Sequence, residues 1–125
     1  MADADRSVHP NALLNYQEAV IKPDKLKKYS LDPTNNVGKY KARAFKSVLG
    51  FDQSNWELLS QSILNELPYH EAVFKEEDEH GKRYTVIMAI IGPNGVTADV
   101  LTGWITEPGT DYSRLTTARV LTKKR

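Results

Sequence analysis

The sequence predicts an α+β domain in which N-terminal helices pack on one face of a four-stranded antiparallel sheet. Helical periodicity is confined to the first half of the 125-residue chain, and apolar segments rich in β-branched residues fill the second half. The links between successive strands are short, which is typical of an antiparallel meander. Because helices and strands are segregated along the chain, the helices are expected to cover one sheet face and leave the other free for binding.

Each helix is predicted from its apolar spacing and from a start or stop signal. Pro23 suits the first turn of a short helix, and Gly50 is a typical residue at the C-terminal end of a second. A third helix is expected to begin at a capping box formed by Ser54 and Glu57 and to end before Pro68. The predicted helices span residues 24–29, 37–49 and 54–67.

Four strands are predicted after the last helix. The segment Arg83–Ile91 reads RYTVIMAII and has the composition of a central strand, and Pro93-Asn94-Gly95 after it is a hairpin signal. A flexible leader is expected over residues 1–12 and a basic tail over 123–125, so that one domain spans residues 13–122. The predicted strands span residues 70–77, 83–91, 96–106 and 114–122.

The composition excludes several classes of protein. The chain has no cysteine, which excludes a disulfide scaffold, a thiolate nucleophile and a cysteine-containing metal site. With only three histidines, neither a metal site nor a cofactor is predicted. The longest apolar run is broken at Gly92, well short of the roughly 20 residues of a membrane span, and the N-terminus lacks a signal-peptide core. We therefore expect a soluble protein that acts in the cytoplasm without contacting a membrane.

The charges are unevenly distributed along the chain. The net charge is +1, yet residues 22–46 carry eight basic and two acidic side chains, whereas residues 52–80 carry one basic and eight acidic. Residues 82–125 are basic again, with seven basic and three acidic side chains. If the two basic segments meet in space they form a surface suited to phosphates, the alternative being ordinary solvated lysines on helix faces.

One lysine lies on the apolar side of its predicted helix. On a helical wheel at about 100° per residue, Lys41 falls between Val37 and Phe45. A lysine there either extends its amine outward along its own stem or points into a partly desolvated cleft. Desolvation and neighbouring cations both lower a lysine pKa, which suits proton transfer or charge stabilisation beside a phosphate. The other basic residues of this helix, Lys39, Arg43 and Lys46, fall on the opposite side.

The last strand offers two further candidate groups. Alternation of faces pairs Arg114 with Thr116 on one side and Arg119 with Thr117 on the other. Either pair could bind a phosphate, and either could equally be a surface arginine beside a threonine of high β-propensity. Trp104 in the preceding strand is expected to be either a core residue or a platform on which an RNA base stacks.

Several segments resemble a known family. Val37–Phe45 reads VGKYKARAF, and Leu14–Ile21, Lys25-Leu26 and Leu49-Gly50 surround it with matching spacing. The pattern resembles an uncharacterised family of small bacterial domains with the motif V-G-x-H-K-A-R-x-F. Its members occur alone and in polymorphic-toxin and phage-related proteins. The later matches are Gly81–Tyr84, Gly92–Gly95, Trp104-Ile105 and Arg114–Thr117.

This family is similar in turn to a broader group of small ribonuclease folds that includes barnase, the EndoU ribonucleases, colicins and the RelE toxins. Those proteins also place N-terminal helices before a four-stranded antiparallel sheet. The resemblance implies that the K-A-R core of the motif falls on Lys41, Ala42 and Arg43. The chain departs from the pattern at Tyr40, where relatives often have histidine. If that histidine is a general base in the relatives, this protein must use another group or be inactive.

The resulting hypothesis is a metal-independent, toxin-like endoribonuclease. It would cleave RNA, with transfer RNA one candidate, by attack of a ribose 2′-hydroxyl on the adjacent phosphate. Alternatives are a non-catalytic module that binds RNA or protein, and a structural appendage of a phage or secreted protein. An immunity protein is a candidate partner, and delivery as the terminus of a secreted toxin is a candidate route. The expected catalytic residues are Lys41, Arg43, Arg114 and Thr117, and the expected RNA-binding residues are Lys39, Lys46, Trp104 and Arg119.

Overall fold

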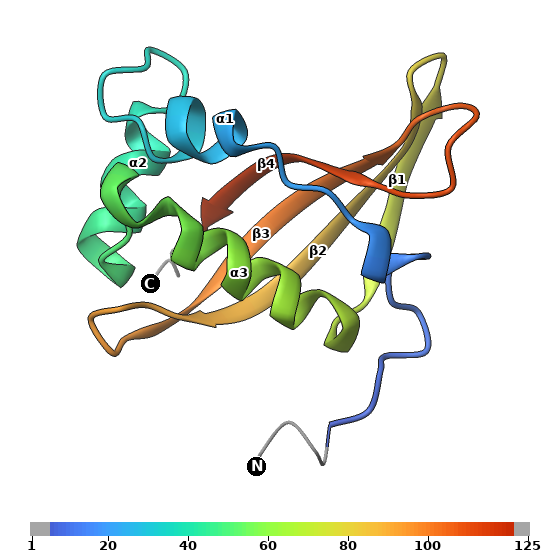
Figure 1. Ribbon diagram of the computed structural model, residues 1–125, viewed down its shortest axis with the longest axis horizontal. Helices are drawn as coiled ribbons and strands as arrows, with labels where there is room; N and C mark the ends of the chain where they lie inside the picture. Colours follow the sequence, from blue (N-terminus) through green and yellow to red (C-terminus); the bar gives the residue numbers. More distant parts are fainter. Residues whose placement is uncertain (1–5, 122–125) are drawn as a thin grey trace.

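The computed structural model describes residues 6–121, in which three helical segments precede a four-stranded sheet (Figure 1). Helix α1 spans Pro23–Lys25 and continues as a wider helical turn over Leu26–Ser30. Helix α2 spans Lys39–Ala44 and continues in the same way over Phe45–Leu49. Helix α3 spans Trp56–Glu66. The predicted α+β class and the order of helices before strands are confirmed.

The sheet is an antiparallel meander in the order β1-β2-β3-β4, as predicted. Bulges interrupt the pairing between Phe74 and Glu76 in β1 and beside Gly103 in β3. The bulge beside Gly103 changes which β4 side chains share a face, so the simple alternation assumed for that strand fails. The strands span Ala72–Asp78 (β1), Gly81–Ile91 (β2), Thr97–Thr106 (β3) and Arg114–Val120 (β4).

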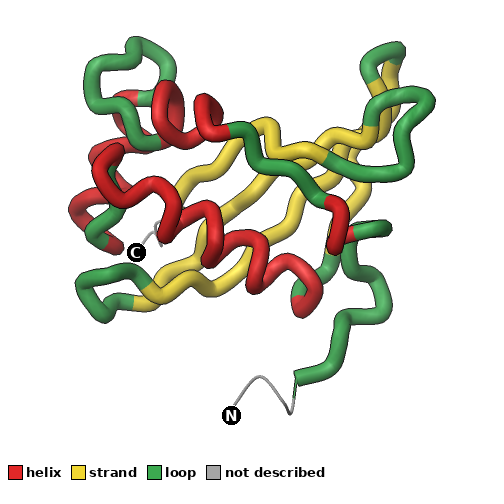
Figure 2. The backbone as a smooth tube through the Cα atoms, viewed as in Figure 1, coloured by secondary structure: helices red, strands yellow, loops and turns green. Residues whose placement is uncertain are grey.

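Helix α3 lies across one face of the sheet, and the core fills the space between them (Figure 2). Leu59 and Ile63 of α3 and Val86 of β2 are fully buried in this core. Phe45 and Phe51 join it from the α2 side, with their rings in edge-to-face contact at 6.5 Å between centroids. Burial of these apolar side chains supplies the main stabilisation of the fold.

The outer edge of β4 is covered by segments that precede α2 in the chain. Val20 forms a parallel bridge with Arg114, and the hydroxyl of Ser30 donates to the carbonyl of Ala118 at 3.2 Å. Figure 1 shows α1 and α2 beside the end of the sheet that carries β4. This arrangement brings the two basic segments of the sequence together at β4.

Two helix starts differ from the prediction for local reasons. The second helix begins at Lys39 because the side-chain oxygen of Asn35 accepts from the backbone N–H of Val37 and of Gly38 and forms a turn there. The third helix begins at Trp56, after a 3-10 turn over Gln53–Asn55 that Asp52 caps through a capping box with Asn55, in place of the predicted box at Ser54.

The expectation of a flexible leader is corrected for residues 6–12. The guanidinium of Arg6 donates to both carboxylate oxygens of Glu66 at 2.9 Å. Further along, the backbone N–H of His9 donates to the carbonyl of Pro68, and Ala72 donates to the carbonyl of Asn11. These bonds fix the segment against the end of α3 and the start of β1. Residues 1–5 and 122–125, including the predicted basic tail 123–125, lie outside the described residues.

Candidate functional site

The most distinctive polar contact between the helices and the sheet joins Lys41 to Thr117. The Lys41 ammonium donates to the Thr117 hydroxyl over 2.7 Å, across 76 positions of sequence. Lys41 comes from the first turns of α2 and is half-buried, and Thr117 is the central residue of β4. The lysine that the helical wheel placed on the apolar side therefore makes a specific contact with the last strand.

The packing of α2 determines where this amine points. Ala42, Phe45 and Leu49 are buried and attach α2 to the core. Gly38, at the start of the helix, lies so close to the helical turn Leu26–Ser30 that a Cβ there would lie 2.0 Å from the carbonyl oxygen of Tyr29. With that helix face and its first turn both fixed, the Lys41 stem runs along the boundary of the core toward β4.

Thr117 lies on the sheet face opposite α3. Its neighbour Ala118 is buried in the core, so Thr117 and Arg119 point to the other face of the strand. Thr117 pairs with Gly103 of β3, where an added Cβ would lie 2.9 Å from the Thr117 methyl group. The absence of a side chain at Gly103 thus gives Thr117 the space it occupies beside Lys41.

The environment of Lys41 lowers its pKa from the ordinary value of 10.5. Desolvation is the largest cause, and the positive charges of Arg119 and then Lys25 act in the same direction. The charge pattern left open whether the two basic segments of the sequence meet, and residues from both of them come together here. An ammonium that is partly desolvated and surrounded by other cations is suited to binding an anion and to giving up a proton.

Arg114 is not part of this cluster, which corrects the expectation that it joins Lys41. Its Nε donates to the Glu107 carboxylate at 3.0 Å, and this bond lowers the Glu107 pKa. Arg114 lies at the start of β4, beside Val20 and the loop that holds Glu107. Arg119 follows Thr117 by two positions in β4 and therefore lies on the same face. Arg119, and not Arg114, is the arginine of this strand that acts on Lys41.

Trp104 is a core residue, so the expectation that it stacks on an RNA base is corrected. Its side chain is only 1% exposed, and its indole N–H donates to the hydroxyl of Thr102 at 2.8 Å. Trp104 lies on the helix-covered face of the sheet because it follows Thr102 by two positions in β3. A ligand on the open face cannot reach the ring.

The remaining cations of α2 lie apart from Lys41. Arg43 and Lys46 are exposed and border a shallow cavity of about 390 Å³ with Asp52 and Ser54. Lys39 is half-exposed, and its amine lies 5.3 Å from the centre of the Tyr40 ring. The structure therefore separates Arg43 from Lys41, although the two are two residues apart in the motif.

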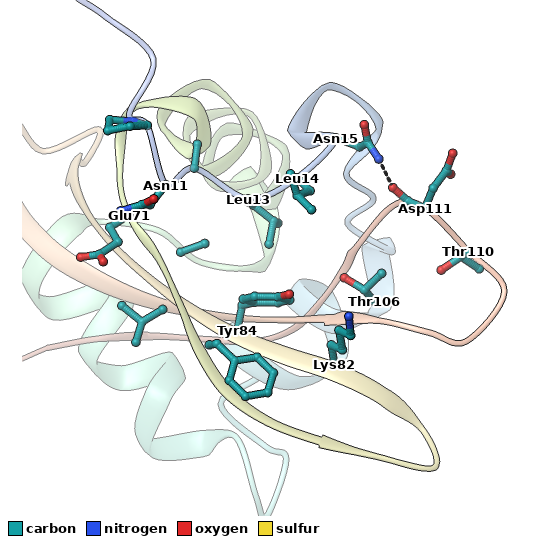
Figure 3. A pocket seen from close by; sticks show the side chains of 15 residues that line it. Asn11, Leu13, Leu14, Asn15, Glu71, Lys82, Tyr84, Thr106, Thr110 and Asp111 are labelled. Atoms are coloured by element: carbon teal, nitrogen blue, oxygen red, sulfur yellow. Dashed lines mark hydrogen bonds between the residues drawn. The ribbon is translucent and has the colours of Figure 1, made fainter.

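A second cavity, of about 590 Å³, lies near β1 on the helix-covered side of the sheet (Figure 3). Leu13 and Leu14 from the N-terminal segment lie opposite Tyr84, with Lys82 and Thr106 at one side. Asn15 closes one end by donating to the carbonyl of Asp111. Sequence reasoning missed this cavity because one wall is formed by a segment partly assigned to a flexible leader.

Neither a metal centre nor a membrane segment is found in the part of the chain that the structure describes. Across residues 6–121 no three histidine, aspartate or glutamate side chains are grouped so that they could hold a metal ion. No helix within the same range has the length and apolar character to span a membrane.

The fold and site define a small α+β domain with a basic cluster at the open side of its last strand. The chain belongs to a family described as a domain of unknown function, DUF6883, whose model matches residues 12–122. Searches of curated proteins and of solved structures found no match to the chain.

Proposed function

We propose that this domain is a metal-independent, toxin-like endoribonuclease that binds the reacting phosphate at Lys41, Thr117 and Arg119. The observation that carries the proposal is the 2.7 Å bond from the Lys41 ammonium to the Thr117 hydroxyl, in a cluster of cations at the open face. Transfer RNA is one candidate substrate. RNA cleavage through the 2′-hydroxyl needs positive charge, an acid and a path for one proton, and none of these requires a cysteine.

In this proposal each group has a separate task in the reaction. The Thr117 hydroxyl accepts a hydrogen bond from Lys41, so its own proton is free to donate to a phosphate oxygen. Two further N–H groups of Lys41 and the Arg119 guanidinium can stabilise the charge that develops on the phosphorane. These three side chains converge from α2 and β4, which both pack on the same core.

The reaction is a transesterification. The 2′-oxygen forms a bond to phosphorus as its proton passes to solvent, and the bond from phosphorus to the 5′-oxygen breaks. The Lys41 ammonium donates a proton to the departing oxygen and is later reprotonated from water. The products are a 2′,3′-cyclic phosphate and a 5′-hydroxyl end. The lowered Lys41 pKa favours this proton donation because it makes the ammonium a stronger acid.

A second candidate function is a non-catalytic module that binds RNA or protein. The observation that favours it is Tyr40, which stands where the resembled family often has histidine and is 66% exposed. Without an imidazole at this position, a cation cluster could hold a phosphate and leave it intact. Such a module would still need Lys41, Thr117 and Arg119 for binding.

The proposal extends to the setting in which the domain works. A toxin-like ribonuclease acts where RNA is found, in the cytoplasm of the target cell, and delivery as the terminus of a secreted protein would bring it there. An immunity protein that protects the producing cell would cover the open face at β4. Both features follow only if the domain cleaves RNA.

The test is incubation of the purified domain with total cellular RNA in EDTA. Discrete fragments are expected from the parent, and Lys41→Ala should lower the cleavage rate by about 10²–10³, the usual effect of removing one donor to a developing charge. Thr117→Val, which keeps the shape and removes the hydroxyl, should lower it less. Lys75→Ala is the matched control, because Lys75 is exposed on β1 at the far edge of the sheet.

Each outcome separates the candidates. Fragments that appear at the parental rate with Lys41→Ala would overturn the site assignment. Retardation of RNA in a gel by the parent, without cleavage, would support the binding module. A parent that neither cleaves nor retards RNA would leave the structural appendage. Circular dichroism of each variant shows whether a loss of activity reflects a loss of fold.

A further inference from the structure

Helix α2 carries a second group of cations, on a different side of the helix from Lys41. Lys39, Arg43 and Lys46 are spaced at i, i+4 and i+7, so they share one side of the helix and point away from the core. The row is about 10 Å long at 1.5 Å per residue. A row of cations alone is common on helix surfaces and does not identify a ligand.

Tyr40 distinguishes this surface from an ordinary basic helix face. Its ring is 66% exposed, whereas Ala42 and Phe45 on the same helix are buried. The Lys39 amine lies 5.3 Å and the Arg43 guanidinium carbon 5.6 Å from the centre of the ring. The aromatic ring is therefore exposed to solvent and held between two cations, directly before Lys41 in the chain.

We propose that Tyr40 is a stacking platform for an unpaired RNA base next to the phosphate bound at Lys41, with Lys39 and Arg43 contacting the flanking backbone. The inference rests on the proposed function and specifies its substrate class as single-stranded RNA. A base can stack on a side chain only when it is free of its own helical stack, so duplex RNA does not fit this surface. The platform expected at Trp104 thus lies at Tyr40 instead.

An acidic protein surface is the other class of ligand that a basic helix attracts. Charge complementarity alone would serve both ligands, but an exposed ring between cations adds a contact that every nucleobase can use. Tyr40 and Lys41 are consecutive on α2, so their side chains project about 100° apart, and together they could engage a base and a phosphate of one strand. These two observations favour RNA.

The test uses a single-stranded oligoribonucleotide that is 2′-O-methylated throughout, so that it lacks the attacking hydroxyl, and that carries one 2-aminopurine. Stacking on Tyr40 is expected to quench the 2-aminopurine fluorescence when the parent binds. Tyr40→Ala should abolish the quenching and weaken binding about tenfold, in the range seen for loss of one base–aromatic stack. Tyr40→Phe should retain both, because it keeps the ring.

Tyr112→Ala is the matched control, since Tyr112 is a tyrosine of 40% exposure in the loop before β4. It should bind and quench like the parent. Equal quenching by Tyr40→Ala and the parent, binding of duplex RNA as tightly as the single strand, or displacement by polyglutamate with no dependence on Tyr40 would each overturn the platform.

Cleavage of total RNA, measured separately, distinguishes the two proposals. If the parent cleaves RNA and Tyr40→Ala has unchanged binding and quenching, only the platform fails. If the parent quenches the probe through Tyr40 but cleaves no RNA, the platform stands and the catalytic proposal fails. A parent that does not bind the probe at all contradicts the platform whatever its activity.

Discussion

Burial and charge act on Lys41 in the same direction. Desolvation penalises the ammonium, and the guanidinium of Arg119 and the amine of Lys25 repel it further. A compensating contact is the bond to Thr117. A bound phosphate would offset all three penalties at once, because an anion near the ammonium favours its charged form. The surroundings of Lys41 therefore favour a bound anion beside the ammonium over water alone.

The pH dependence of cleavage should report this environment. In the proposed reaction Lys41 acts in its protonated form, so cleavage should be lost as the pH rises through its pKa, and the lowered pKa should place that loss below the ordinary value of 10.5. Arg119→Ala removes a positive neighbour, so the Lys41 pKa and the alkaline loss of activity should both move to higher pH. The cleavage rate against pH checks this, together with an NMR titration of the Lys41 side chain. An alkaline limb that stays in place or moves to lower pH would contradict the assigned role.

The pairing of β3 with β4 determines the position of Thr117. Gly103 pairs with Thr117, and the bulge beside it brings the Thr116 hydroxyl within 3.0 Å of the position where a Cβ would stand. Thr116 and Thr117 both belong to β4, the strand that Lys41 of α2 contacts. The edge of β4 beyond them is closed by Val20 and Ser30, so the strand cannot move outward freely.

Gly103→Ala should therefore displace Thr117 and lengthen its contact with Lys41. The added Cβ would lie 2.9 Å from the Thr117 methyl, closer than normal packing allows. We expect a loss of stability of about 1–3 kcal/mol, typical of an overpacked site, together with reduced cleavage. Urea denaturation measures the first and the RNA assay the second. Gly95→Ala is the control, because a Cβ there meets nothing within 4 Å, although its φ of 86° adds local strain. Unchanged activity in a folded Gly103→Ala variant would argue against Thr117 as a positioning group.

The whole molecule is electrostatically polarised. Basic side chains of α1 and α2 lie at the β4 end of the sheet (Figure 1), and four of the eight carboxylates of the acidic segment, Glu76, Glu77, Asp78 and Glu79, lie on β1 and its turn at the opposite edge. A polyanion would be attracted to one end of such a molecule and repelled from the other. The overall charge of +1 conceals this separation because it sums both ends.

A clamp formed by Arg6, Glu66 and His70 ties the N-terminal segment to the rest of the domain. Arg6 and His70 both hold Glu66, with His70 Nε2 at 2.9 Å from the carboxylate, and the bond from Arg6 is the largest cause of the lowered Glu66 pKa. Since the folded-state pKa lies below the ordinary value of 4.5, this contribution to stability is present above that pH and is lost as the pH falls through the folded-state value.

Arg6→Ala should lower the free energy of unfolding by about 1–2 kcal/mol at neutral pH, as for a partly exposed charge-assisted pair. The difference from the parent should shrink as Glu66 becomes protonated. Urea denaturation over a series of pH values checks both statements. Arg83→Ala is the comparison: its contacts with Glu76 and Asp78 are 3.7 Å long and exposed, so its effect should be close to zero. An Arg6→Ala difference that grows at low pH would contradict the clamp.

The elements could be predicted because they depend on local pattern. The apolar spacing of the helices, the β-branched run Arg83–Ile91 and the turn at Pro93-Asn94-Gly95 each act over a few residues, and the meander followed from short links. Lys41 could be selected for the same reason, since the wheel depends on one helix alone. Its half-burial and lowered pKa agree with that selection.

Partners across the fold could not be predicted in this way. A bulge at Gly103 changed the faces of β4, an ion pair with Glu107 removed Arg114 from the cluster, and packing against the helices buried Trp104. These contacts depend on how strands, loops and helices pack together, which no local sequence pattern specifies. Periodicity and turn chemistry alone predict the fold class, the order of its elements and the unusual lysine, because these depend on a few neighbouring residues. The placement of Thr117 and Arg119 beside that lysine, and the exposure of the Tyr40 ring, follow from the packing of the folded chain, because side-chain packing selects contacts that no local pattern encodes.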